Sequence, residues 1–177
     1  MSRGRPRLSL VEAALLLCIA AIVLAVFVPA FIHRVRTNKI SEAAELLQEM
    51  HDRAAAYYET SWGAKKRFCL PPGAGPTPAS PSVDLVDVEF AAEEQTGHAS
   101  WAALGFQPER PLRYSYSYRP SHHGCDLPTE GERRTVSFRA EGDLDGDAVL
   151  STFERRAEIE ADGLQPVGAL HVHQRVE

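Results

Sequence analysis

The first part of the chain is dominated by a long apolar stretch. Residues 13–32 carry no charged side chain, whereas the residues before them include Arg3, Arg5 and Arg7. Twenty apolar residues of this kind form a helix long enough to cross the hydrocarbon core of a bilayer, which is about 30 Å thick. The pattern therefore predicts a transmembrane helix over residues 13–32.

After this stretch, apolar residues recur at three- and four-residue steps, as on one face of a helix. These positions are Ile40, Ala43, Ala44, Leu47, Met50, Ala54, Tyr57 and Tyr58. The other faces hold Glu42, Glu45, Glu49, Asp52 and Arg53. We therefore expect one long helical segment over residues 8–60, helical from Ser9 to about Glu59. Its amphipathic second half should pack on a globular domain.

Residues 61–111 are rich in loop-forming residues. Five prolines fall between Pro71 and Pro81, and we expect an extended loop there. Residues 97–106 are expected to form a short turn or helix with Trp101 pointing inward.

Residues 112–177 show the alternation typical of a β-sheet. Leu112, Tyr114, Tyr116 and Tyr118 alternate with polar residues, which predicts a strand whose tyrosines face the core. Further strands are expected over residues 135–140, 150–159 and 170–176. A long helix followed by antiparallel strands predicts an α+β fold with a small antiparallel sheet packed on the second half of the helix.

Glu12 is a lone carboxylate at the entrance to the apolar stretch. An unpaired acid at membrane depth costs about 2.5 kcal/mol or more, which indicates that a partner charge meets it. The alternative is that Glu12 lies at headgroup depth and is hydrated.

Together these features resemble the N-terminus of type IV pilins and of the related type II secretion pseudopilins. Those proteins have a short basic leader, a cleavage point, an apolar-polar-apolar-apolar-Glu start and a proline in the first helix. The resemblance implies that residues 1–7 are a leader cleaved between Arg7 and Leu8, and that Glu12 and Pro29 are the family's glutamate and helix-kinking proline. This chain departs from the family at Arg7, where the family has glycine.

The resemblance also implies what the protein does. It indicates a structural filament subunit of a pilus or a secretion pseudopilus, with like subunits, a prepilin leader peptidase and the bacterial inner membrane as partners. The C-terminal domain would lie in the periplasm, and Glu12 would neutralise the N-terminal amine of a neighbouring subunit. Two alternatives are an uncleaved single-span membrane protein that presents a calcium-binding periplasmic domain, and a periplasmic ligand-binding module.

Composition narrows the choice of function. The formal net charge is −5 and the chain has no long basic run, which disfavours nucleic-acid binding. The sequence shows no nucleophile–base pair, phosphate-binding loop or zinc-ligand spacing, and we therefore expect no catalysis.

The three cysteines fall into two environments. Cys18 lies within the apolar stretch and is expected to behave as a small apolar residue, whereas Cys69 and Cys125 lie in polar surroundings. If the domain is periplasmic, an oxidising compartment, we expect a Cys69–Cys125 disulfide; two free thiols are the alternative. His122, His123 and Cys125 could instead form a metal site, but the disulfide is the better use of Cys125. We expect His171 and His173 to be surface residues.

Residues 143–154 match a twelve-residue calcium loop, with acids at positions one, three, five and twelve. Alternating aspartates in a tight turn bring their carboxylates together, and Ca²⁺ takes six to eight oxygens. The expected ligands are Asp143, Asp145, Asp147, the carbonyl of Val149 and a side chain from Ser151 or Glu154. Ala148 occupies position six, where glycine is expected, so the left-handed turn is strained. A solvated acidic turn without metal is the alternative.

Overall fold

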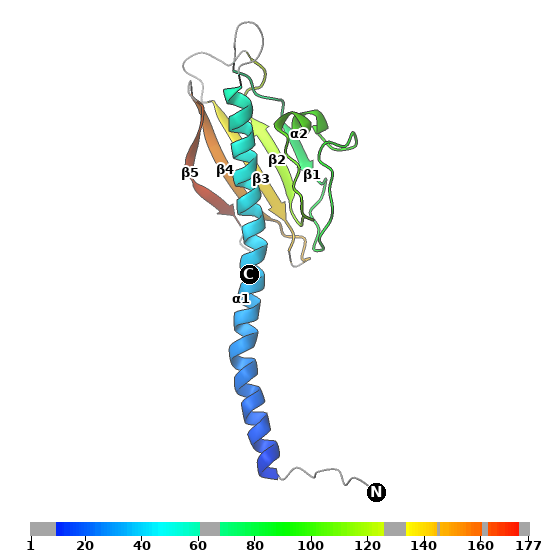
Figure 1. Cartoon of the computed structure of the whole chain (residues 1–177), viewed down its shortest axis with the longest axis vertical. Helices are drawn as coiled ribbons and strands as arrows, with labels where there is room; N and C mark the ends of the chain where they lie inside the picture. The colour runs from blue at the N-terminus through cyan, green and yellow to red at the C-terminus, as the bar shows by residue number, and fades with distance from the viewer. Residues whose placement is uncertain (1–9, 61–67, 126–133, 145, 161–162, 174–177) are drawn as a thin grey trace. The chain divides into compact units, whose positions relative to one another are not determined.

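The fold combines one long helix with an antiparallel sheet (Figure 1). The computed structural model describes residues 10–60, 68–125, 134–144, 146–160 and 163–173, and of residues 30–39 it describes the backbone alone. The chain divides into two compact units, Met1–Lys39 and Ile40–Glu177. The α+β class predicted from the sequence is confirmed.

Helix α1 extends from Leu10 to Glu59 and is unbroken at Pro29. In the first unit, Leu10–Pro29 is long and apolar enough to span a membrane, with a mean hydropathy of 2.9, and the fold buries none of it. At 1.5 Å per residue these 20 residues measure about 30 Å. The expected helix start at Ser9 lies outside the described residues.

In the second unit, residues 40–59 of α1 pack on the sheet. Ala43, Leu47, Met50, Ala54 and Tyr58 are all at most 3 % exposed, which confirms the apolar stripe predicted from the spacing. Burial of a large apolar side chain contributes about 1.5–3 kcal/mol. This part of α1 is therefore held by tertiary packing.

The sheet has five antiparallel strands in the order β1-β2-β3-β4-β5. Their bounds are β1 Ala74–Thr77, β2 Ser115–Pro120, β3 Thr135–Gly142, β4 Ser151–Glu160 and β5 Gly163–His173. The sequence placed β3 and β4 to within two residues. It missed residues 163–169 of β5, because Pro166 and Gly168 argue against a strand, and the expected strand residues 174–176 lie outside the described part of the chain. Proline is tolerated there because β5 is an edge strand, whose outer side needs no donor.

The expectation of an extended loop between Pro71 and Pro81 is wrong at residues 74–77, which form β1. This strand pairs with β2, with Thr77 opposite Tyr116. A Cβ at Gly75, whose φ is 88°, would collide with the carbonyl oxygen of Tyr116. The close approach of β1 to β2 therefore requires a glycine at this position.

Two tyrosines of the predicted stripe, Tyr116 and Tyr118, lie on the inward face of β2, and the third, Tyr114, directly precedes the strand. All three are 0 % exposed. Across the ladder, Tyr116 faces Ala140 and Tyr118 faces Phe138. The core role expected of the tyrosines is confirmed.

A short helix, α2 (His98–Leu104), covers one end of this core. Trp101 is fully buried, as predicted, and its indole N–H donates a 3.0 Å hydrogen bond to the hydroxyl of Thr77 in β1. The rings of Trp101, Phe106 and Phe90 lie 5.1–5.5 Å apart between centroids. These contacts fix the segment before β2 against the sheet.

The predicted Cys69–Cys125 disulfide is present and joins residues 56 positions apart. Beside it, Leu70 and Gly124 exchange two backbone hydrogen bonds of 3.1 and 2.7 Å. In the chain-entropy model, closing a loop of this length stabilises the fold by about 4 kcal/mol. Since Cys125 is oxidised, it is not available as the metal ligand considered with His122 and His123.

The buried tyrosines predict a loss of stability in alkali. Burial raises the pKa of Tyr114, Tyr116 and Tyr118 above 10.0, and the nearby Glu42 raises the pKa of the first two further. Above pH 10 the unfolded chain loses protons that the folded chain retains. The free energy of unfolding should therefore be unaffected by these groups below pH 10 and fall above it by about 1.4 kcal/mol per pH unit for each such tyrosine.

Urea unfolding of the full chain in detergent between pH 9 and 11 measures this slope. Tyr118→Phe should make the slope shallower. Equal stability of the wild-type chain at pH 9.5 and pH 11 would contradict the prediction.

Candidate functional site

The main functional feature of the first unit is its exposed apolar surface. Twelve large apolar side chains between Leu10 and Val28 are at least 45 % exposed. Their transfer out of water would contribute roughly 20 kcal/mol. Monomeric soluble proteins do not leave a continuous patch of this size uncovered, so this surface indicates a lipid or protein environment.

Glu12 is exposed in the first turn of α1, directly before the uncharged run that begins at Ala13. A carboxylate in the first turn interacts favourably with the positive end of the helix dipole. The predicted cleavage residues, Arg7 and Leu8, lie outside the described residues.

In the second unit, the buried carboxylate of Glu42 joins α1 to the sheet. Its side chain is 7 % exposed and accepts hydrogen bonds from the backbone N–H of Arg113 at 2.9 Å and the hydroxyl of Tyr116 at 3.4 Å. The guanidinium of Arg113 lies 4.0 Å away. The prediction that Glu42 lies away from the packed face of the helix is therefore wrong. The spacing of apolar residues does not reveal a polar side chain that is buried with hydrogen-bond partners.

A second polar contact lies four turns further along α1. The hydroxyl of Tyr58 donates a 3.0 Å hydrogen bond to the carbonyl oxygen of Glu160 at the end of β4. Glu42 and Tyr58 thus bind opposite ends of this part of α1 to different strands. Two directional contacts this far apart fix how far the helix can slide along the sheet.

The proposed calcium loop lies between β3 and β4. One carboxylate oxygen of Asp143 accepts the N–H of Gly146 at 2.9 Å, and the other accepts the N–H of Ala148 at 3.1 Å. Asp147 accepts the N–H of Val149 at 2.7 Å. Ala148 has a φ of 66°, the left-handed conformation expected at position six. Asp145 lies outside the described residues.

The structure separates Glu154 from the other predicted ligands. The turn closes at the pair Gly142–Ser151, whereas Glu154 lies three residues further along β4, opposite Arg139. Its carboxylate accepts a 2.6 Å hydrogen bond from Arg156. The described residues bring together no group of three acidic, histidine or cysteine side chains that would hold a metal. Among the described residues of the β3–β4 turn, Asp143 and Asp147 carry the carboxylates.

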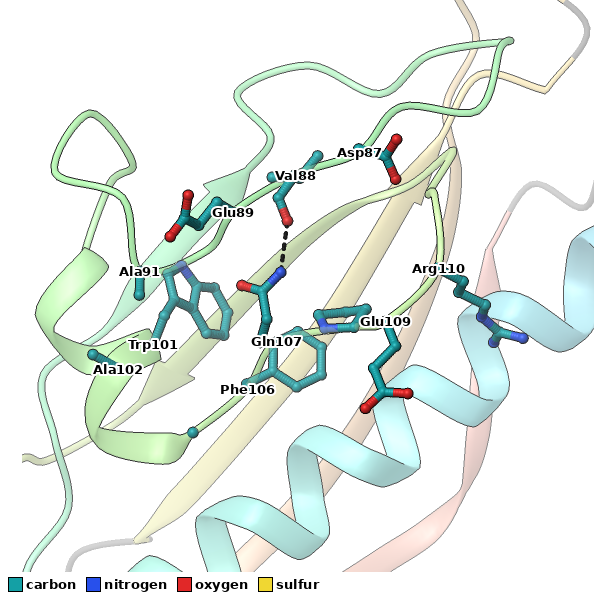
Figure 2. A pocket seen from close by; sticks show the side chains of 12 residues that line it. Asp87, Val88, Glu89, Ala91, Trp101, Ala102, Phe106, Gln107, Glu109 and Arg110 are labelled. Carbon is teal, nitrogen blue, oxygen red and sulfur yellow. Dashed lines mark hydrogen bonds between the residues drawn. The ribbon is translucent and has the colours of Figure 1, made fainter.

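A groove of about 750 Å³ lies between residues 87–91 and 101–110 (Figure 2). Its two sides are joined by Gln107, whose amide N–H donates to the carbonyl oxygen of Val88 and whose amide oxygen accepts the N–H of Phe90, both at 2.9 Å. No motif in the sequence predicts this groove, because it depends on the side chain of one glutamine in an irregular segment.

His171 and His173 are exposed on edge strand β5, as expected. They face Glu154 and Thr152 of β4, respectively.

No protein-family model matches the chain, and no curated protein or solved structure is significantly similar to it. The pilin-like architecture of an N-terminal apolar helix and a five-stranded antiparallel sheet therefore rests on the fold itself.

Glu42 and Glu45 form a matched pair for testing the helix–sheet contact. Glu42→Ala should lower the free energy of unfolding by about 2–3 kcal/mol, because the Arg113 N–H and the Tyr116 hydroxyl lose a buried acceptor. Glu45→Ala should cost less than about 1 kcal/mol, since its 2.8 Å ion pair with Arg110 is exposed. Urea unfolding in detergent provides the comparison, and equal losses in the two variants would refute a special role for Glu42.

Proposed function

We propose that the chain is a structural subunit of a type IV pilus-like or type II secretion pseudopilus filament. The observation that carries this proposal is the exposed apolar helix Leu10–Pro29 on a chain whose α1 continues into the core of a five-stranded sheet. A structural role of this kind requires surfaces for association and no catalytic residues.

Before assembly, Leu10–Pro29 would anchor the subunit in the inner membrane as a single span. Its length of about 30 Å matches the hydrocarbon core. The Cys69–Cys125 disulfide supports an oxidising compartment for the second unit. These features together support a periplasmic location for that unit.

Assembly would follow removal of residues 1–7 by a leader peptidase, which frees the amine of Leu8. In the filament, Glu12 of one subunit would neutralise this amine on its neighbour. Away from water, an unmatched charge is costly, so the pair favours one axial register. Apolar packing between helices would provide most of the association energy.

A second candidate function is an uncleaved single-span membrane protein that presents its second unit to a periplasmic partner. The observation that favours it is Arg7, which stands where the family's leader ends in glycine. In this alternative the apolar segment remains in lipid and Glu12 has no terminal amine to meet.

We further propose that the β3–β4 turn binds Ca²⁺ through Asp143, Asp145 and Asp147, without Glu154. Each carboxylate oxygen of Asp143 accepts one N–H and retains a second lone pair, so Asp143 can also bind a cation. The left-handed conformation of Ala148 is the one needed at the sharp turn of a calcium loop. When bound, the cation would offset the mutual repulsion of the acids.

We predict that Glu12→Ala blocks filament assembly and leaves membrane insertion intact, because it removes the partner of the amine and not the apolar span. Glu12→Asp, which keeps the charge, should retain part of the assembly. Filament yield by electron microscopy and membrane content by fractionation give the two measurements. Normal incorporation of the alanine variant would contradict the proposed register role.

Calcium should stabilise the folded chain. At a free concentration a hundred times the dissociation constant, one site raises the free energy of unfolding by about 2.7 kcal/mol. The urea concentration at the midpoint of unfolding, measured on the full chain in detergent, should rise with Ca²⁺ and return to its original value when a chelator is added. Asp145→Asn should abolish the shift, and Asp84→Asn, an exposed acid outside the turn, should not. An unchanged wild-type transition would exclude the calcium role.

A further inference from the structure

The groove in Figure 2 combines apolar walls with acidic margins. Val88, Ala91, Ala102 and Pro108 line it together with the buried aromatic residues Trp101 and Phe106. Methylene groups can pack on such walls, so the groove suits a side chain with an apolar stem.

Three exposed carboxylates, those of Asp87, Glu89 and Glu109, stand around this groove (Figure 2). None of the three has an ion-pair partner among the described residues. The groove's cation, Arg110, is bonded to Glu45 of α1 at 2.8 Å. The groove therefore presents uncompensated negative charge beside apolar surface, and its chemical complement is a long cationic side chain.

The sheet carries a side chain of this type on another surface. Arg119 is exposed near the end of β2 and alternates with the inward-facing Tyr118, which places it on the sheet face opposite α1. Two other sheet arginines are already paired: Arg139 with Glu141 at 3.3 Å and Arg156 with Glu154 at 2.6 Å. Arg119 has no ion pair within the described part of the chain.

We propose that Arg119 of one copy of the chain inserts into this groove on a second copy. Its methylenes would contact the apolar walls, and its guanidinium would be held by Glu89 and Glu109. The groove lies beside α1 and α2, whereas Arg119 lies on the opposite sheet face, so the contact joins two different surfaces. In a pair joined by such a heterologous contact, one copy still has a free groove and the other a free Arg119, so the contact can propagate through many copies. The inference rests on the proposed filament function and names a surface that would join its subunits.

Zero-length crosslinking locates the contact directly. A carbodiimide joins carboxylates to primary amines, and the native lysines are Lys39, Lys65 and Lys66, so Arg119→Lys adds one amine at the proposed contact. The full chain is assembled from equal amounts of ¹⁵N-labelled and unlabelled copies, treated with the reagent and analysed by mass spectrometry. We expect mixed-isotope crosslinks from position 119 to Asp87, Glu89 or Glu109. Intermolecular crosslinks from position 119 that go only to other acids would overturn the inference.

Charge reversal measures how much the contact contributes. Glu109→Arg and Arg119→Glu should each weaken self-association roughly tenfold, because they place like charges together. The double variant should recover most of this loss. Glu93→Arg reverses an exposed acid that does not line the groove and should associate like the wild type. Energy transfer between labelled copies across a series of protein-to-detergent ratios reports the association.

The outcomes separate the two proposals. If wild-type copies associate but both single reversals associate equally well, the groove contact is wrong and the filament proposal stands. If wild-type copies do not associate at any ratio, the filament proposal fails, and the groove contact fails with it.

Discussion

Hydrophobic burial differs sharply between the two parts of helix α1. Residues from Ala43 to Tyr58 place their apolar side chains against the sheet, whereas the side chains of Leu10–Pro29 have no cover within the fold. The exposed segment Leu10–Pro29 therefore needs a lipid or protein environment outside the fold. The segment from Ala43 to Tyr58 belongs to the core of the folded unit. The proposed sequence of membrane anchoring followed by assembly gives the exposed part first lipid and then other helices as its environment.

Polar contacts give the packed part of α1 a defined position. Apolar side chains pack with little directional preference, but Glu42 must meet the N–H of Arg113 and Tyr58 must reach the carbonyl of Glu160. A buried acceptor is costly to leave unmade, so these contacts disfavour other registers. Since Tyr116 donates to the same carboxylate, the tyrosine stripe contributes both apolar area and orientation.

The sequence predicted the features that follow from periodicity, namely the apolar helix, the stripe from Ala43 to Tyr58 and the tyrosine strand. The disulfide followed from the expected compartment. Features that depend on long-range partners were missed: β1 forms because Gly75 allows close approach to β2, and Glu42 is buried because Arg113 and Tyr116 receive it. For the candidate site, spacing placed Asp143 and Asp147 in one turn, but the β3–β4 register, which spacing does not determine, moves Glu154 away. The groove beside Gln107 had no sequence signal.

The central claim is that copies of the apolar segment cover one another. Cys18 tests it directly, because it lies in this segment and is exposed, while the other two cysteines are joined to each other. Packed helices lie about 8–10 Å apart, so a bismaleimide with a reach of about 15 Å, which also spans a modest axial offset, can connect neighbouring copies. Treatment of the assembled full chain should give covalent dimers through Cys18, and none with Cys18→Ser. Monomers alone, in material where the thiol is fully labelled, would contradict the account.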